Sequence, residues 1–104
     1  MILVPRVKDA VEIHDLGDED QAQLMREVSQ CSRGIKRHFK GVNKMNVGAI
    51  GCVCRQLHVH VLGRFENDVV WPRPVWGATN PKPYGDKATE AVDFMKRAIK
   101  CERV

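Results

Sequence analysis

Residues 52–62 read CVCRQLHVHVL, and apolar and polar side chains alternate along this run. Such alternation is typical of a β-strand with one buried and one polar face, so we predict a strand over residues 53–62. The buried face would hold four apolar residues: Val53, Leu57, Val59 and Val61. The opposite face would hold five hydrogen-bonding residues: Cys52, Cys54, Gln56, His58 and His60. A slip of one residue would exchange the two faces, so the pattern indicates a fixed register.

The segments before this strand favour a small antiparallel sheet. Residues 46–50 predict a second strand, joined to the first by a turn around Gly51, which supplies the backbone freedom that a turn needs. Residues 1–7 predict an edge strand, because Pro5 cannot donate to a central ladder. Arg55 interrupts the apolar face, so we expect it at the strand entrance, with its stem buried and its guanidinium in water.

Two segments have the spacing of amphipathic helices. The first begins at Asp18 and ends at Gly41, and it has a stripe of apolar residues: Leu24, Val28, Cys31, Ile35 and Phe39. The second begins at Asp86 and has a similar face: Ala88, Val92, Met95 and Ile99. Residues 63–82 are rich in Pro, Trp and Gly and predict an ordered loop. The expected fold is therefore α+β, an antiparallel sheet packed with one long helix and a C-terminal helix.

Length and composition set the outer limits. The chain has 104 residues, of which 43% are hydrophobic, so we predict a single domain over residues 1–104. The net charge of +4 favours phosphate-bearing partners without requiring them. The longest run free of charged side chains spans ten residues, whereas a membrane helix needs about 20. We therefore expect a cytoplasmic protein without a membrane partner, in which the four cysteines are small buried residues rather than disulfide partners.

The polar face of the predicted strand indicates a pocket. A single histidine there would most often be a satisfied polar group, whereas two histidines and a glutamine in alternation need three sets of partners. An imidazole held on a strand can act as a nucleophile, a base or a metal ligand. The metal interpretation has support, because the same face carries four residues of zinc-ligand type: Cys52, Cys54, His58 and His60.

Distance argues against a four-ligand metal site. Along a straight strand of about 3.3 Å per residue, Cys52 and His60 would lie roughly 26 Å apart and could not share one ion. Only His58 and His60 could do so, with a third ligand such as His14. We therefore expect neither a metal nor another cofactor, and the two-histidine metal site remains an alternative.

Several motifs together resemble one protein family. The string QLHVHVL at residues 56–62 resembles the His-x-His-x-His signature of the histidine triad (HIT) family, with Gln56 in the first place. Further motifs extend the resemblance to short bacterial HIT-like proteins over nearly the whole chain: LVPR at residues 3–6, EIHDL at 12–16, Asn46 ten residues before Gln56, and WPRPVWG at 71–77. The resemblance implies the HIT architecture.

The resemblance also implies a nucleotide hydrolase or transferase that cleaves a phosphoester, phosphoanhydride or phosphoramidate bond. In that family the middle histidine attacks an α-phosphate and forms a nucleotidyl intermediate, and His58 holds that position. By the same resemblance His60 and Asn46 stabilise charge, and Gln56 orients the site. The implied substrate is a nucleotide or dinucleoside polyphosphate, and the implied assembly is a homodimer. Gln56 cannot change its charge, so a nucleotide-binding protein with little turnover is the alternative.

Three more residues are candidates for substrate binding. Cys52 stands where the family often has a Gln or Asn that contacts phosphate, and a thiol is a weaker donor. Arg64 could bind phosphate bidentately or be a solvated charge at a strand end. Trp71 could line the rim of the site or clamp the loop onto the sheet. We do not expect binding of nucleic acid, because the basic residues of the first helix lack interleaved aromatics: Arg33, Lys36, Arg37, Lys40 and Lys44.

Overall fold

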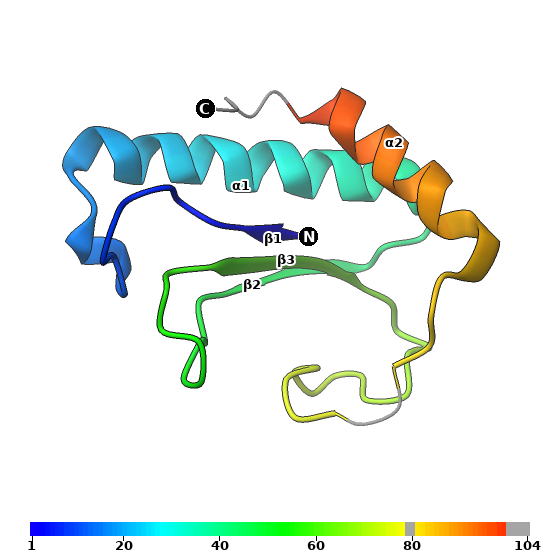
Figure 1. The fold of residues 1–104 in the computed structure, drawn as a ribbon. Coiled ribbons are helices and arrows are strands. Elements are labelled where there is room, and N and C mark those ends of the chain that lie inside the picture. Colours follow the sequence, from blue (N-terminus) through cyan, green and yellow to red (C-terminus); the bar gives the residue numbers. More distant parts are fainter. Residues whose placement is uncertain (79–80, 100–104) are drawn as a thin grey trace.

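The structure is a computed structural model that describes residues 1–78 and 81–99. Within these residues a three-stranded antiparallel sheet has the order β1-β3-β2, with the strands β1 (Ile2–Leu3), β2 (Lys44–Gly48) and β3 (Val59–Arg64). The helices are α1 (Asp18–His38) and α2 (Ala88–Ala98), and two short 3-10 turns are η1 (Ile13–Asp15) and η2 (Gly85–Lys87). Figure 1 shows both helices on one side of the sheet and the loop after β3 on the other side. The predicted α+β class is confirmed.

Helix α1 covers the sheet with the stripe of apolar residues that its spacing predicts. The buried members of that stripe are Leu24, Val28, Cys31 and Ile35. The helix ends at His38 rather than at Gly41, because Phe39 already has an extended backbone. Gly34 is also buried, and a Cβ there would lie 3.3 Å from the methyl carbon of Met95. The glycine therefore allows α2 to approach α1 closely.

Strand β3 is the central strand, and its two faces differ. Val59 and Val61 are buried and belong to the core cluster that includes α1, as the alternation predicts. His60 points to the opposite face and is only partly buried. The register pairs His60 with Gly48 of β2 and with Ile2 of β1. The sheet therefore presents His60 on the side away from α1.

The predicted strand over residues 53–62 is wrong in its first half. The chain bends at residues 52–54, and Val53, which the alternation placed in the core, is 100% exposed. Arg55 is exposed in the same loop rather than at a strand entrance. The reason lies in the neighbouring strands, because β1 ends opposite Val59 and β2 ends opposite His60. Residues before Val59 have no strand beside them to pair with, so alternation alone does not extend β3.

The hairpin between β2 and β3 is confirmed, but its connection is longer than expected. The second strand was predicted over residues 46–50, and β2 occupies Lys44–Gly48 instead. Residues 49–58 form the connection, which replaces the predicted tight turn at Gly51. This long connection, here called the β2–β3 loop, lies next to the chain after β1, because the amide of Leu57 donates to the carbonyl of Ala10 at 2.9 Å.

The edge position of β1 is confirmed, although the strand covers only Ile2–Leu3 of the predicted residues 1–7. The second helix begins at Ala88 rather than at Asp86, since residues 85–87 form η2. Its residue Met95 is buried as expected, whereas Val92 is 52% exposed. No helix in the described ranges is both long and apolar enough to span a bilayer.

The cysteines divide into two kinds. Cys31 is fully buried, as expected of a small apolar residue. Cys52 and Cys54 are exposed, which contradicts the expectation for them, because both lie in the β2–β3 loop instead of on a strand. Cys101 lies outside the described residues.

Candidate active site

His58 lies immediately before β3, and the backbone orients its ring. Nδ1 of His58 lies 2.7 Å from the carbonyl oxygen of Gln56. A carbonyl oxygen can only accept a hydrogen bond, so Nδ1 carries the proton and donates it. In the neutral ring Nε2 therefore keeps its lone pair. This arrangement suits a nucleophile, a base or a metal ligand.

Gly51 brings the β2–β3 loop against the same ring. Its φ of +47° lies in the left-handed region, which favours glycine. A Cβ at this position would lie 2.8 Å from Cε1 of His58, closer than carbon atoms can approach without displacement. Nδ1 of His58 is the next ring atom, at 3.4 Å, so the loop borders the edge of the ring that carries the proton. Glycine is required here for its backbone conformation and for this contact.

His60 lies beside His58, and a tryptophan packs against His60. The centroids of the two imidazole rings are 5.4 Å apart, and the ring of Trp76 stands edge-on to His60 with a centroid distance of 6.1 Å. Trp76 lies over Gly48, where a Cβ would come within 2.9 Å of the indole. Trp76 is thus the tryptophan next to the histidines, although Trp71 is the one that the sequence analysis singled out.

A pocket of about 230 Å³ lies beside His58. Its walls come from the β2–β3 loop and from the segment before η1, and they include three of the predicted site residues: Cys52, Gln56 and His58. Two charged residues that sequence reasoning missed also line it, Glu12 and Arg55. A guanidinium in such a place is a ready phosphate ligand. The signal for Arg55 was present in the sequence as an arginine that did not fit the apolar face.

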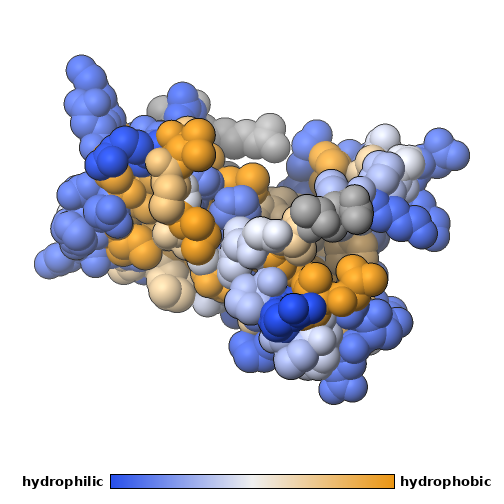
Figure 2. All heavy atoms as spheres, turned by 90° about the horizontal axis from the view of Figure 1, so that it is seen from below, coloured by the Kyte–Doolittle hydropathy of each residue, from blue (hydrophilic) through white to orange (hydrophobic). Residues whose placement is uncertain are grey.

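A larger cavity is unrelated to these residues. It has a volume of about 760 Å³, lies between α1, α2 and β3, and is lined mainly by apolar side chains such as Phe39, Tyr84 and Val92. None of the predicted site residues lines it. The smaller pocket is therefore the one that combines an open space with imidazole and charged groups. Figure 2 shows the loop side of the molecule, where apolar patches are separated by polar surface.

Gln56 contributes more through its backbone than through its side chain. The carbonyl oxygen holds His58, whereas the side-chain Nε2 donates to the carbonyl of Pro5 at 3.4 Å. The side chain therefore ties the β2–β3 loop to the segment after β1. The orienting role implied for Gln56 has a structural basis in its carbonyl group, which any residue type would supply.

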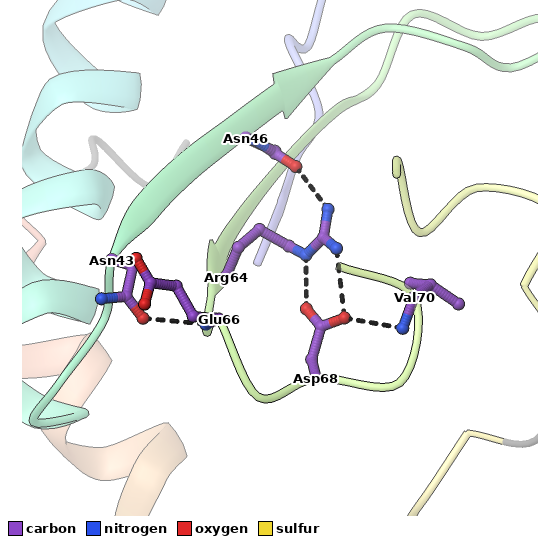
Figure 3. Close-up of polar contacts among 6 residues, drawn as sticks. All are labelled: Asn43, Asn46, Arg64, Glu66, Asp68 and Val70. Carbon is purple, nitrogen blue, oxygen red and sulfur yellow. Dashed lines mark hydrogen bonds and ion pairs between the residues drawn. The ribbon is translucent and has the colours of Figure 1, made fainter. Parts of the chain in front are cut away.

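Arg64 is at the centre of a buried polar network, shown in Figure 3. Its side chain donates to both carboxylate oxygens of Asp68, at 2.7 and 3.2 Å, and to Oδ1 of Asn46 at 2.9 Å. Arg64 is only 2% exposed, so of the two alternatives for this residue the solvated charge is wrong. Its guanidinium lies 5.7 Å from the ring centroid of Trp71, within the range of a cation–π contact. The Arg64 side chain also holds the pKa of Asp68 at about 2, well below the usual range.

The seven predicted site residues thus fall into two groups. The first group lies at the pocket or beside it: Cys52, Gln56, His58 and His60. The second group forms the network around the buried guanidinium: Asn46, Arg64 and Trp71. No residue of the second group lines the pocket. Trp71 contacts Arg64, and this contact favours the alternative in which Trp71 clamps the loop onto the sheet.

The distance argument against a metal site assumed a straight strand, and the bend at residues 52–54 removes that assumption. Even so, residues 1–78 and 81–99 contain no group of three or more His, Cys, Asp or Glu side chains that could hold a metal ion. The two-histidine alternative with a third ligand such as His14 therefore finds no support in the described part of the chain.

Comparison with known proteins defines the class of this protein. The family model of the HIT domain matches residues 1–67 of the sequence, so the chain belongs to the HIT family. This agrees with the triad-like motif, in which Gln56, His58 and His60 occupy successive alternate positions in the sequence.

Solved structures of histidine triad proteins have the same fold. One from Bradyrhizobium japonicum is 43% identical in sequence with a TM-score of 0.87, and the match covers 94% of this chain and 73% of the other chain. A second, from Sinorhizobium meliloti, is 41% identical with a TM-score of 0.81, covering 91% and 71%. A third, from Marinobacter aquaeolei, is 40% identical with a TM-score of 0.83, covering 95% and 72%. Among curated proteins no sequence matches this chain.

Proposed function

We propose that this protein is a nucleotide hydrolase or transferase in which Nε2 of His58 attacks the phosphorus that carries the nucleoside. The main support is the hydrogen bond of 2.7 Å from Nδ1 of His58 to the carbonyl of Gln56, which leaves Nε2 with its lone pair. Membership of the HIT family supports the class of reaction. The position of His58 on the wall of a pocket supports access for a substrate.

The reaction proceeds in two displacements. A bond forms between Nε2 of His58 and phosphorus, and the leaving group departs with the electron pair of the bond that it shared with phosphorus. Water or another acceptor then attacks the same phosphorus, and the bond to His58 breaks. Two smaller barriers replace one large barrier, which is the benefit of a covalent intermediate. No metal or organic cofactor is needed for these steps.

Negative charge on the phosphoryl oxygens requires donors. His60 is the nearest imidazole, with its ring 5.4 Å from that of His58, and Arg55 supplies a cation on the pocket wall. Each well-placed donor contributes about 100-fold or more to such a reaction. Asn46 lies outside the pocket lining, so its proposed contact requires a phosphate chain that extends past His60.

The volume of the pocket indicates which part of the substrate it holds. Sites that enclose a whole small ligand typically measure roughly 300–1,000 Å³, and this pocket measures about 230 Å³. We therefore propose that the pocket holds the reacting phosphate of a nucleotide, dinucleoside polyphosphate or nucleoside phosphoramidate. The nucleoside would extend over the rim.

The decisive experiment compares the wild type with His58→Ala on a fluorogenic adenosine phosphoramidate. We expect turnover to fall by at least roughly 1,000-fold, because the nucleophile is removed. His14→Ala is the matched control, since the His14 side chain is 83% exposed and lies off the pocket lining, and it should retain activity. Turnover that survives in His58→Ala would remove His58 from the role of nucleophile.

A nucleotide-binding protein with little turnover is the second candidate. The observation that favours it is Gln56 at the first triad position, whose amide cannot supply a proton and instead donates a hydrogen bond to the carbonyl of Pro5. Nucleotide binding without turnover in the wild type would select this candidate. Arg55→Ala should weaken binding in either case, because it removes a cation from the pocket wall.

A further inference from the structure

The β2–β3 loop carries two thiols that the proposed reaction does not use. Cys52 and Cys54 are exposed and form no disulfide, whereas Cys31 is fully buried. Val53, between the two thiols, is 100% exposed, so this part of the loop is open to solvent. Their exposure contrasts with the usual burial of unpaired cysteine.

Cys52 lies where a change to its side chain would affect the candidate site. It lines the same pocket as His58, and the residue before it, Gly51, packs against the His58 ring. A group attached to the Cys52 sulfur would compete with a phosphate for a volume of about 230 Å³. Glu12 and Arg55 are the charged residues on the walls of this pocket, and Arg55 would attract an anionic reagent.

The fold of the loop is compatible with a reaction between Cys54 and Cys52. Residues 52–54 form a bend, and the carbonyl of Cys54 lies 2.9 Å from the place that a Gly51 Cβ would occupy. The chain therefore folds back on itself at this point. Two Cα atoms separated by one residue lie at most about 7.6 Å apart. A disulfide needs about 4.4–6.8 Å between its Cα atoms, and a bend shortens the span from the extended limit toward this range.

Covalent modification explains these two thiols better than metal binding does. Among the described residues no group of three or more His, Cys, Asp or Glu side chains could hold an ion. Covalent chemistry needs only an accessible thiol and, for resolution, a second thiol nearby.

We propose that Cys52 is a modification site for small disulfides such as glutathione disulfide, that the group attached to Cys52 closes the His58 pocket, and that Cys54 as the resolving thiol removes this group. The effect of pocket closure on turnover rests on the proposed function. The modification itself depends on the thiols and on the loop.

The chemistry is a pair of thiol–disulfide exchanges. The Cys52 thiolate attacks one sulfur of the reagent, the sulfur–sulfur bond of the reagent breaks, and one half leaves as a thiolate while the other half stays on Cys52. The Cys54 thiolate then attacks the Cys52 sulfur and releases the second half. The two protons from the protein thiols go to the two departing thiolates. In total one reagent disulfide is reduced to two thiols, and Cys52 and Cys54 are oxidised to a disulfide.

Intact-mass spectrometry of the folded protein tests the modification. The experiment uses a Cys101→Ser background, so that the three remaining thiols are those the structure describes. With glutathione disulfide we expect the loss of two hydrogen masses, and Cys54→Ser should instead keep one glutathionyl group on Cys52. Cys31 is the internal control and should stay unmodified. Glutathionylation of Cys54 with an unmodified Cys52, or no reaction at either thiol, would overturn the proposal.

Protection of His58 tests the closure of the pocket without an activity assay. Diethyl pyrocarbonate acylates accessible imidazole nitrogen, and peptide mapping shows which histidine has reacted. In the Cys54→Ser protein a glutathionyl group on Cys52 should slow the acylation of His58 at least tenfold, and dithiothreitol should restore it. Acylation of His14, which is 83% exposed, should not change. Equal acylation of His58 with and without the adduct would refute the closure.

Turnover provides the third measurement. If the unmodified Cys54→Ser protein hydrolyses the phosphoramidate, its activity should fall in parallel with glutathionylation of Cys52 and recover with dithiothreitol. If the unmodified protein shows no turnover, the proposed function fails, while the mass and protection measurements still decide the proposal about Cys52. Full activity in Cys54→Ser protein that carries a glutathionyl group on Cys52 would contradict the closure of the pocket.

Discussion

At the scale of single residues, the site depends on what surrounds one imidazole ring. The Gln56 carbonyl accepts a hydrogen bond from Nδ1 of His58 and so keeps the proton on that nitrogen, and Gly51 borders the ring at Cε1. Neither effect comes from a charged or catalytic side chain. One is a backbone acceptor and the other is the absence of a Cβ. Small changes at these positions should therefore affect the chemistry without removing any functional group.

Gly51→Ala tests this idea at the residue scale. The new Cβ would lie 2.8 Å from the His58 ring, so we expect the ring to shift and turnover to fall by roughly 10- to 100-fold. A φ of +47° should also cost about 1–2 kcal/mol in the free energy of unfolding. Turnover and urea denaturation measure the two effects separately.

Gly85→Ala is the matched control for this substitution. Gly85 has a similar φ of +61°, but nothing lies within 4 Å of its added Cβ. It should lose stability to a similar degree and keep its turnover. Equal losses of turnover in the two variants would show that Gly51 acts through stability and not through the His58 ring.

At the scale of elements, the buried guanidinium of Arg64 holds the loop after β3. Arg64 ends β3, is almost fully buried, and binds Asp68 of the loop and Asn46 of β2. Asp68 also accepts the amide of Val70 at 2.9 Å. The network therefore anchors the beginning of the segment that carries Trp76 to the side of His60. Arg64 serves here as a link between strand and loop.

Asp68→Asn should destabilise the protein, because a buried guanidinium loses its counter-charge. We expect the melting temperature at neutral pH to fall by roughly 5 °C or more. Asp93→Asn on the exposed surface of α2 is the matched control and should change little. An unchanged melting temperature in Asp68→Asn would show that the ion pair does not hold the loop.

The same pair predicts a dependence of stability on pH. The pKa of Asp68 is about 2 in the folded state and 3.8 in the reference state, so the folded state binds its proton more weakly. Its contribution is therefore fully present above about pH 5 and is lost as the pH falls from about 4 to 2. The difference in melting temperature between the wild type and Asp68→Asn should narrow over that interval. A difference that stays constant down to pH 2 would contradict this linkage.

At the scale of the whole molecule, we propose that two chains associate as a homodimer. The short strand β1 is at the sheet edge, and its Ile2 is 55% exposed. An open edge with apolar side chains has a physical reason to pair with another chain. Analytical ultracentrifugation at micromolar concentration should give twice the chain mass of 11.8 kDa, and a monomer would refute the proposal.

Periodicity in the sequence was sufficient to predict the α+β class, helix α1 and the burial of Leu57, Val59 and Val61, because those patterns reflect which side chains leave water. The positions of His58 and His60 followed from the same alternation and the triad-like motif. Where β3 begins was not predictable in this way. A strand ends where its neighbours end, and that depends on β1 and β2, which are distant in sequence from Val53.

The chain on its own thus determined the helices, most of the core and the choice of His58 as the candidate nucleophile, since these depend on local composition and spacing. Tertiary structure alone decided the surroundings of that imidazole. Contacts between segments far apart in the chain buried Arg64 with Asn46, and the fold of the β2–β3 loop placed Arg55 and Cys52 at the pocket. Such contacts depend on which distant segments pack together, and residue patterns along the chain do not predict that packing.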